Sequence, residues 1–241
     1  RLSDYGRARH CCLLESRDYL SESKGNELTF GTASPALYMT GRGEVFQIRA
    51  LSPAGRRMIG YLSEHRERFD FCREIRFEDD RIGGTIRHTE KTVDEQSRLK
   101  SISQMDVIRA AAFAFELASP PFRVTCGLLG AISYDFIDQF ENLPENKEDM
   151  LGNPDYELYF ADNIFLMDHH QGKGYIVVNA IITNGDRRAI YEEAMECFDS
   201  YLEKVRTLRP EGAFYDGPAA KPSTDTPRKE YEAMVQKAQQ H

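Results

Sequence analysis

The sequence predicts an α+β fold in which largely antiparallel strands, in one or more sheets, are covered by helices. Strand-like segments occur in pairs joined by tight turns, a pattern typical of antiparallel hairpins. Capped amphipathic segments lie between and after these pairs. With 241 residues, 41% of them hydrophobic, the chain can bury a core without disulfides or metal.

The first fifty or so residues are predicted to be mainly strands. Residues 11–14 form a short apolar run that ends at the polar pair Glu15 and Ser16, which predicts a buried strand running into a turn. The polar residues 16–25 are predicted to form a loop. Three further strands are predicted, over residues 28–30, 36–40 and 45–51. Gly41-Arg42-Gly43 supplies the positive-φ residues that the tight turn between the last two requires.

A helix, a strand and a charged segment are predicted to follow. Ser52 is the N-cap and Pro53 the first residue of a helix that runs to about residue 68. Residues 71–77 alternate apolar and charged side chains, as a half-buried strand does. The strongly charged stretch 78–100 contains two adjacent glycines and is predicted to be exposed.

The second half of the chain is predicted to combine helices with a second hairpin. Ser103 caps a helix over residues 104–118, and residues 124–133 form the most apolar strand. Asp135 is predicted to cap a short helix. The hairpin and a long amphipathic helix follow, over residues 156–167, 175–182 and 186–207.

The chain is predicted to divide near its C-terminal end. Residues 1–208 form the main domain. Residues 209–225, rich in Pro, Gly and small polar residues, are predicted to be a linker. Residues 226–241 begin a new helix and end within it, which indicates the first helix of a further, truncated domain.

Composition and charge exclude several classes of protein. The formal net charge of −8 argues against nucleic acid as the main partner, because phosphate binding needs a basic face. No run approaches the roughly 18 apolar residues of a membrane helix, and no signal peptide opens the chain. The five cysteines are odd in number and fit no disulfide framework, so reduced thiols in a cytoplasmic protein are expected.

Most short motifs have a structural interpretation. Gly127-Leu128-Leu129-Gly130 lacks the spacing of a dinucleotide-binding loop, so its glycines are predicted to let another backbone pack closely. Asp168-His169-His170 is predicted to be a turn, because adjacent ligands in a hairpin seldom converge on one metal ion. Cys126 and Cys197 lie in apolar segments, where thiols are usually inert. No hydrolase or phosphate-loop motif is present.

Leu13-Leu14-Glu15-Ser16 is the one short motif that indicates a binding chemistry. It places a carboxylate and a hydroxyl at the end of a buried strand, at the rim of an apolar core. An aromatic amino acid suits that environment, because its ring needs an apolar slot, its ammonium an acceptor and its carboxylate a donor. The alternative interpretation is a polar pair that merely ends a strand at a turn.

Four stretches, in order, resemble the N-terminal part of the large, chorismate-using subunit of anthranilate synthase, component I. They are Leu13-Leu14-Glu15-Ser16, residues 46–52 (FQIRALS), residues 127–135 with 140–144 (GLLGAISYD and FENLP), and residues 230–238 (EYEAMVQKA). The third stretch is the most specific. Together they span nearly all of the chain.

This resemblance implies a fragment of a larger lyase in tryptophan biosynthesis. The full enzyme adds ammonia to chorismate and eliminates pyruvate, giving anthranilate. The ammonia comes from a glutamine amidotransferase, component II, which is separate or fused. The family's chorismate and Mg²⁺ ligands lie in a domain beyond His241, so this chain is expected to hold no catalytic and no metal-binding residues and to be inactive alone. An oligomer is compatible with this expectation.

The resemblance also implies feedback control by L-tryptophan. Family members bind this inhibitor at the Leu-Leu-Glu-Ser motif, so Ser16 and the neighbouring Glu15 are the expected ligands within a regulatory domain of residues 1–208. Family members carry a lysine ten residues after that serine, where this sequence has Asn26. The contact to the carboxylate of the effector is therefore expected to differ here.

Three alternatives stay open. The first is component I of aminodeoxychorismate synthase in the folate pathway, which shares the architecture, although Glu15 favours anthranilate synthase. The second is a stand-alone amino-acid-binding module, which the truncated final helix disfavours. The third is a hydrolase that uses a cysteine, which lacks an obvious paired base.

Overall fold

The computed structural model describes residues 9–15, 28–87, 101–118, 120, 124–141, 143, 149, 151–207, 224 and 226–240. The chain divides into two compact units, Arg1–Leu208 and Arg209–His241. The second unit contains helix α5 (Arg228–Gln239), and the sheets belong to the first unit.

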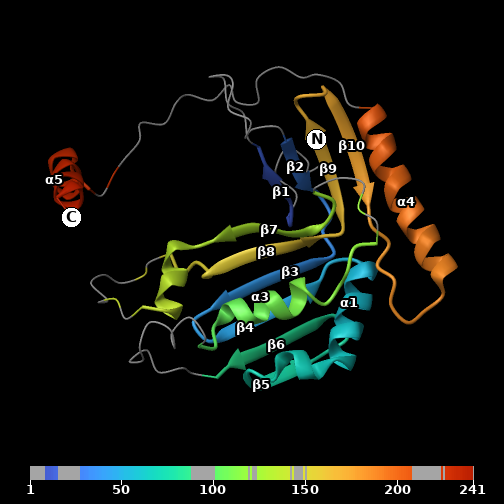
Figure 1. Cartoon of the computed structure of the whole chain (residues 1–241), viewed down its shortest axis with the longest axis horizontal. Coiled ribbons are helices and arrows are strands. Elements are labelled where there is room, and N and C mark those ends of the chain that lie inside the picture. Colours follow the sequence, from blue (N-terminus) through green and yellow to red (C-terminus); the bar gives the residue numbers. More distant parts are fainter. Residues whose placement is uncertain are drawn as a thin grey trace. The chain divides into compact units, whose positions relative to one another are not determined.

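The first unit is built on two antiparallel sheets (Figure 1). Within the described ranges, the larger sheet has six strands in the order β5-β6-β4-β3-β8-β7, and the smaller has four in the order β1-β2-β9-β10. The larger sheet comprises β3 (Leu37–Arg42), β4 (Val45–Ala50), β5 (Cys72–Phe77), β6 (Arg81–Ile86), β7 (Gly127–Ile132) and β8 (Tyr156–Ala161). The smaller comprises β1 (Cys12–Leu14), β2 (Leu28–Thr32), β9 (Asn163–Asp168) and β10 (Lys173–Val178).

Helices cover both sheets. Helices α1 (Pro53–Glu64) and α3 (Gln104–Ala112) pack on one face of the six-stranded sheet, and α4 (Arg187–Arg206) lies along β10 (Figure 1). Two short 3₁₀ helices are η1 (Arg66–Phe69) and η2 (Tyr134–Gln139). The predicted α+β class with largely antiparallel sheets is confirmed.

Local sequence determines where α1 and α3 begin. The Ser52 hydroxyl accepts a hydrogen bond from the Gly55 N–H at 3.1 Å, and Pro53 occupies the first helical position. Ser103 and Asp106 form a capping box, in which the Asp106 carboxylate accepts from the Ser103 N–H at 2.9 Å. Both helix starts are at the predicted positions.

The main core lies between the six-stranded sheet and its two helices. Strand alternation directs one apolar face of the sheet toward α1 and α3. Buried members of this core are Leu37, Met39, Ile48, Met58, Ile59, Leu62, Ile82 and Val107. A smaller cluster of Leu129, Ala161 and Ile164 includes side chains from both sheets.

Strand β6 corrects the prediction of an exposed charged segment. It lies between β5 and β4 in the sheet, with Ile82 and Ile86 buried. The sequence pattern of this strand is weak. It contains two glycines and is flanked by charged residues, and only the two isoleucines mark its buried face. The rest of that predicted segment, residues 88–100, lies outside the described residues.

The segment predicted as one strand over residues 156–167 is two strands in different sheets. β8 belongs to the six-stranded sheet and β9 to the four-stranded sheet, and Asp162 separates them. The chain makes a similar passage between β2 and β3, through residues 33–36. Periodicity misses the break because apolar residues continue on both sides of it.

Some predicted element boundaries are wrong. The helix predicted over residues 104–118 ends at Ala112, and the first helix ends at Glu64. Ser133 rather than Asp135 caps η2, because its hydroxyl accepts from the Asp135 N–H at 3.2 Å. Side-chain caps mark helix starts clearly, whereas these helix ends carry no comparable signal.

Burial keeps the thiols of Cys126 and Cys72 protonated at neutral pH. Burial raises the pKa of Cys126 to about 12 and that of Cys72 to about 11. Among the described residues there is no disulfide. In the same residues, no helix has the length and apolar character needed to cross a bilayer.

Candidate functional site

The motif singled out in the sequence lies at the edge of the four-stranded sheet. β1 is the outermost strand and pairs with β2, with Leu14 opposite Phe30. Glu15 follows β1 directly and is exposed. Ser16, the other predicted effector ligand, and Asn26 lie outside the described residues.

Strand β1 is exposed, which corrects the prediction of a buried strand. Leu13 is 64% exposed and Leu14 is 39% exposed. The reason is that β1 has a neighbouring strand on one side only. Because consecutive residues of a strand point to opposite faces, each face of this edge carries one exposed leucine, and Glu15 follows directly.

Gly31 on β2 allows β1 to lie close. A Cβ atom at this position would clash with the carbonyl oxygen of Cys12 and would lie 3.2 Å from Leu13 Cδ1. Any side chain here would push β1 away or displace Leu13. Gly31 thus positions the exposed leucine on the sheet edge.

Packed apolar side chains lie next to this edge, on the neighbouring strands β2 and β9. Phe30 pairs with Leu14 on one side and with Leu166 on the other, so a row of apolar residues crosses three strands. Leu166 and Ile164 are almost fully buried. An aromatic ring on this edge would contact one of the two leucine side chains, and an ammonium group would find an acceptor at Glu15.

A polar and aromatic cluster directly before β1 was missed from the sequence. The centroid of the His10 ring lies 4.9 Å from that of Tyr38 and 5.8 Å from that of Tyr159. His10 Nε2 accepts a hydrogen bond from Arg49 Nη2 at 3.1 Å, and the Tyr159 hydroxyl donates to Glu157 at 2.8 Å. His10 has a φ of 61°, a conformation that is strained for a residue with a side chain.

The His10 and Tyr159 side chains of this cluster are uncharged at neutral pH. Burial, followed by the charge of Arg49, lowers the pKa of His10, so the ring can accept from Arg49 at neutral pH. Burial, followed by the hydrogen bond to Glu157, raises the pKa of Tyr159. The sequence gives no signal for this cluster, because strand register alone brings its members together.

His169 and His170 lie in the turn between β9 and β10, as predicted, whereas Asp168 is the last residue of β9. Asp168 accepts a hydrogen bond from the Gln171 N–H at 2.8 Å, and His169 Nε2 lies 2.7 Å from Thr29 Oγ1. His169 therefore ties the β9–β10 turn to β2. Across the ranges that the structure describes, no three His, Cys, Asp or Glu side chains are grouped as a metal site.

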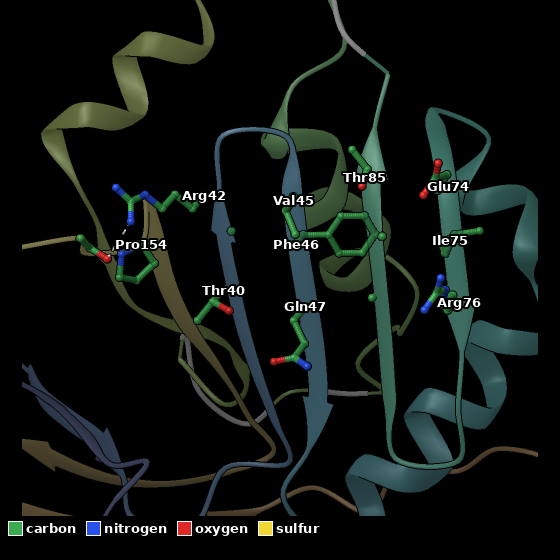
Figure 2. A pocket seen from close by; sticks show the side chains of 14 residues that line it. Thr40, Arg42, Val45, Phe46, Gln47, Glu74, Ile75, Arg76, Thr85 and Pro154 are labelled. Carbon is green, nitrogen blue, oxygen red and sulfur yellow. Dashed lines mark hydrogen bonds between the residues drawn. The ribbon is translucent and has the colours of Figure 1, made fainter. Parts of the chain in front are cut away.

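A broad hollow of about 630 Å³ lies over β3, β4, β6 and β5 (Figure 2). Polar and apolar side chains surround it, among them Thr40, Val45, Gln47 and Thr85. Gly83 leaves this space empty. A Cβ there would have no neighbour closer than 3.8 Å, so a side chain at this position would project into the hollow. Arg42 at its rim is paired with Asp149 at 2.7 Å. Glu15, the predicted effector ligand that the structure describes, does not line this hollow.

These features define an antiparallel α+β protein with a candidate amino-acid site at a sheet edge. The family model described as chorismate binding enzyme matches residues 61–241. Because this match covers most of the chain, the chain belongs to the chorismate-binding enzyme family.

Similar proteins within this family are named anthranilate synthase component 1. One from Mycolicibacterium smegmatis is 30% identical over 137 residues, which cover 55% of this chain and 25% of that protein. One from Serratia marcescens is 25% identical over 195 residues, covering 80% of this chain and 36% of that protein. A crystal structure of anthranilate synthase component I from Streptococcus pneumoniae TIGR4 matches with a TM-score of 0.46 and 16% identity, over 93% of this chain and 40% of that chain.

The sequence matches confirm the resemblance predicted from the four stretches. The chain spans between 25% and 36% of the length of these two relatives.

Proposed function

We propose that this chain is the effector-sensing part of an anthranilate synthase component I. The complete enzyme would convert chorismate and ammonia to anthranilate and pyruvate, a lyase reaction of tryptophan biosynthesis. The observation that carries this proposal is the exposed apolar edge of β1, which runs directly into Glu15 in a chain of the chorismate-binding enzyme family.

L-Tryptophan is the proposed ligand of this edge. Leu13, the more exposed of the two leucines, offers apolar contact to the indole ring, and the Glu15 carboxylate accepts from the ammonium group. Ser16 supplies a hydroxyl group to the carboxylate of the ligand. Covering an exposed leucine with an aromatic ring removes apolar area from water, which favours binding.

Inhibition requires that tryptophan bind one conformation of the enzyme more tightly than another. β1 is three residues long and has one neighbouring strand, so its pairing with β2 opens at low free-energy cost. A ligand that binds β1 can therefore shift the equilibrium between its paired and displaced positions. A coupling free energy of about 1–3 kcal/mol, typical of allosteric sites, changes affinity by about 5–150-fold.

The catalytic parts are proposed to lie elsewhere in the complete enzyme. We assign no step of the reaction to the described part of this chain. The Mg²⁺ and chorismate ligands are proposed to come from other parts of the enzyme. Ammonia is proposed to come from glutamine amidotransferase component II, in the cytoplasm.

The first test is the product formed by the protein that the complete gene encodes. The purified enzyme is given chorismate, ammonium and Mg²⁺, and anthranilate is followed by its fluorescence. We expect anthranilate formation that L-tryptophan inhibits and D-tryptophan does not. Formation of 4-amino-4-deoxychorismate instead would overturn the proposal in favour of the folate enzyme.

The second test is directed at the edge of β1. Ser16→Phe and Glu15→Gln should relieve inhibition by L-tryptophan with little change in the uninhibited rate, because both change the ligand site and neither touches the reaction. Glu203→Gln, on an exposed position of α4, is the matched control and should be inhibited like the wild type. Inhibition constants equal to wild type in Ser16→Phe would reject this site.

A further inference from the structure

A second candidate site lies where the chain passes from one sheet to the other. The passage from β2 to β3 and the passage from β8 to β9 are side by side. Asn163 Nδ2 donates to the Ser34 carbonyl at 2.6 Å, and the Ala36 N–H donates to the Phe160 carbonyl at 2.8 Å. A cavity of about 160 Å³ lies here, against the start of α1 and the middle of α4. It shares no lining residue with the edge of β1.

One wall of the cavity carries a buried carboxyl group. Asp162 is 6% exposed, and its Oδ1 accepts from Asn163 Nδ2 at 3.0 Å. Asn163 Oδ1 accepts in turn from the Tyr201 hydroxyl at 2.6 Å. Among the residues described, no Lys or Arg forms a salt bridge with Asp162. A buried carboxylate without a cation is unfavourable, so this site would be stabilised by a positively charged group.

Another part of the wall carries a guanidinium with a spare donor. Arg57 Nη1 and Nη2 donate to the two carboxylate oxygens of Glu193, at 2.7 and 3.0 Å. The Nε–H of Arg57 is buried and has no acceptor within the described part of the chain. A guanidinium that binds one carboxylate end-on can still donate from its Nε edge to a second acceptor.

The rest of the wall is largely apolar and limits the size of any occupant. It includes Val178, Ile190, Ala194 and Cys197. The volume of about 160 Å³ is close to the roughly 150 Å³ of a protein cavity known to hold benzene. The occupant therefore has about six or seven non-hydrogen atoms, and L-tryptophan, roughly twice that size, does not fit.

We propose that this cavity binds a small zwitterion, an L-α-amino acid with a short side chain such as alanine or serine. The carboxylate of the ligand accepts from Arg57 Nε–H, and its ammonium group donates to the Asp162 carboxylate. The short side chain contacts Ala194. Each charge of the ligand then meets an opposite charge, while the Arg57–Glu193 pair stays intact.

Asp162 must be ionised to bind the ammonium group. Burial raises the pKa of Asp162 to about 7, so both of its forms are populated near neutral pH. Cys126, Cys197 and Tyr201 face it, and burial raises the pKa of each, so they stay uncharged there. Arg57 and Glu193 are the charged pair on the same cavity. Binding should therefore strengthen as the pH rises through about 7.

Calorimetry and thermal unfolding of the whole chain test the proposal. We expect saturable binding of L-alanine and L-serine and a rise in Tm with their concentration. Affinity should be about tenfold weaker at about pH 6 than at about pH 8, in proportion to the ionised fraction of Asp162. Absence of saturable binding for both amino acids, or affinity independent of pH, would overturn the proposal.

Two analogues separate the roles of the two charges without any mutation. L-Lactate has a hydroxyl group in place of the ammonium group, L-alaninamide lacks the carboxylate, and each has as many non-hydrogen atoms as L-alanine. Each should bind the wild-type chain at least about tenfold more weakly than L-alanine, since a charged group in the cavity loses its partner. Equal affinity for L-alanine and both analogues would contradict the proposed contacts even if no variant folded.

Variants then locate the site. Ala194→Met fills the cavity and Asp162→Asn removes the acceptor charge, so both should lose L-alanine binding. Tyr191→Phe, at an exposed position of α4, is the control and should bind like the wild type. Loss of this site leaves tryptophan inhibition through Ser16 unaffected, so the two proposals fail separately. Competition between L-tryptophan and L-alanine would contradict the assignment of two sites.

Discussion

At the scale of single residues, close backbone contacts leave no room for a side chain at certain glycines. A Cβ at Gly130 on β7 would clash with the Glu157 carbonyl oxygen and would lie 3.0 Å from Leu158 Cα. Gly31 has the same relation to β1. The sequence predicted close backbone packing at both glycines of Gly127-Leu128-Leu129-Gly130. The structure confirms this for Gly130 and corrects it for Gly127, where a Cβ would have no neighbour within 4 Å and the positive φ of 142° favours glycine instead.

Gly31→Ala should lower the free energy of unfolding by about 1–3 kcal/mol, because the added methyl group clashes with the backbone of β1. Urea denaturation measures the change. Gly60→Ala is the matched control, since nothing lies within 4 Å of a Cβ added at that exposed position of α1. That variant should gain about 0.5–1 kcal/mol from helix propensity. Equal effects of both substitutions would contradict the role of Gly31.

Asp162 should make the protein less stable as pH rises. Its pKa is about 7 in the folded state against 3.8 ordinarily, so the folded chain holds the proton more tightly than the unfolded chain. The protonated Asp162 carboxyl contributes up to about 4 kcal/mol to the free energy of unfolding. This contribution is fully present below about pH 4 and is lost as pH rises through about 7. Asp162→Asn should lack this decline in urea denaturation across the pH range. Parallel pH profiles for the two proteins would disprove it.

The candidate site could be predicted only where neighbours in sequence are neighbours in space. Leu13-Leu14-Glu15-Ser16 is continuous in the sequence, so residue types alone predicted effector ligands at Glu15 and Ser16, although at the end of a buried strand rather than an exposed one. His10 and Arg49 meet through strand register, and Arg57 meets Glu193 through helix packing. Such contacts between distant segments leave no pattern in a single sequence.

At the scale of elements, α4 is held by polar contacts more than by apolar burial. In this helix of 20 residues, Ile190 and Tyr201 are the buried side chains described. Tyr201 hydrogen-bonds to Asn163 and lies 2.9 Å from Ser34 Oγ. Each of these contacts joins α4 to a passage between the sheets.

Tyr201→Phe should lower the free energy of unfolding by about 1–3 kcal/mol, because Asn163 loses a buried hydrogen-bond donor. Amide hydrogen exchange should show faster opening of α4 than in the wild type. Tyr191→Phe removes a hydroxyl from an exposed side chain of the same helix and should have little effect. Similar losses in the two variants would refute the role of the buried hydroxyl.

Helix starts could be predicted and helix ends could not, for a physical reason. Ser52 and Ser103 satisfy backbone N–H groups that would otherwise lack partners, and this requirement selects a few residue types. Helix α3 ends at Ala112 although apolar residues continue beyond it. Strand β6 was missed because its buried face depends on two isoleucines.

At the scale of the whole first unit, two passages of chain connect the sheets, and the apolar cluster of Leu129, Ala161 and Ile164 includes residues of both sheets. Antiparallel pairing and the α+β class could be predicted from local hairpin signals. The division into two sheets could not, because it depends on the change of direction at Asp162 and at residues 33–36.

The two sheets should therefore unfold together. Amide hydrogen exchange in increasing denaturant should give β3 and β8 of the larger sheet the same opening free energy as β9 of the smaller. The shared passages and the common apolar cluster are the reason. Separate opening of the four-stranded sheet at a lower denaturant concentration would contradict this expectation.

The passages also restrict which changes in length the chain tolerates. Side chains alternate between faces along a strand, so inserting or deleting one residue beside Asp162 would turn β9 over while leaving β8 in place. Ile164 and Leu166 would then face outward. A two-residue insertion preserves the alternation but shifts the register of β9 against β2. These short connectors must therefore keep their residue count.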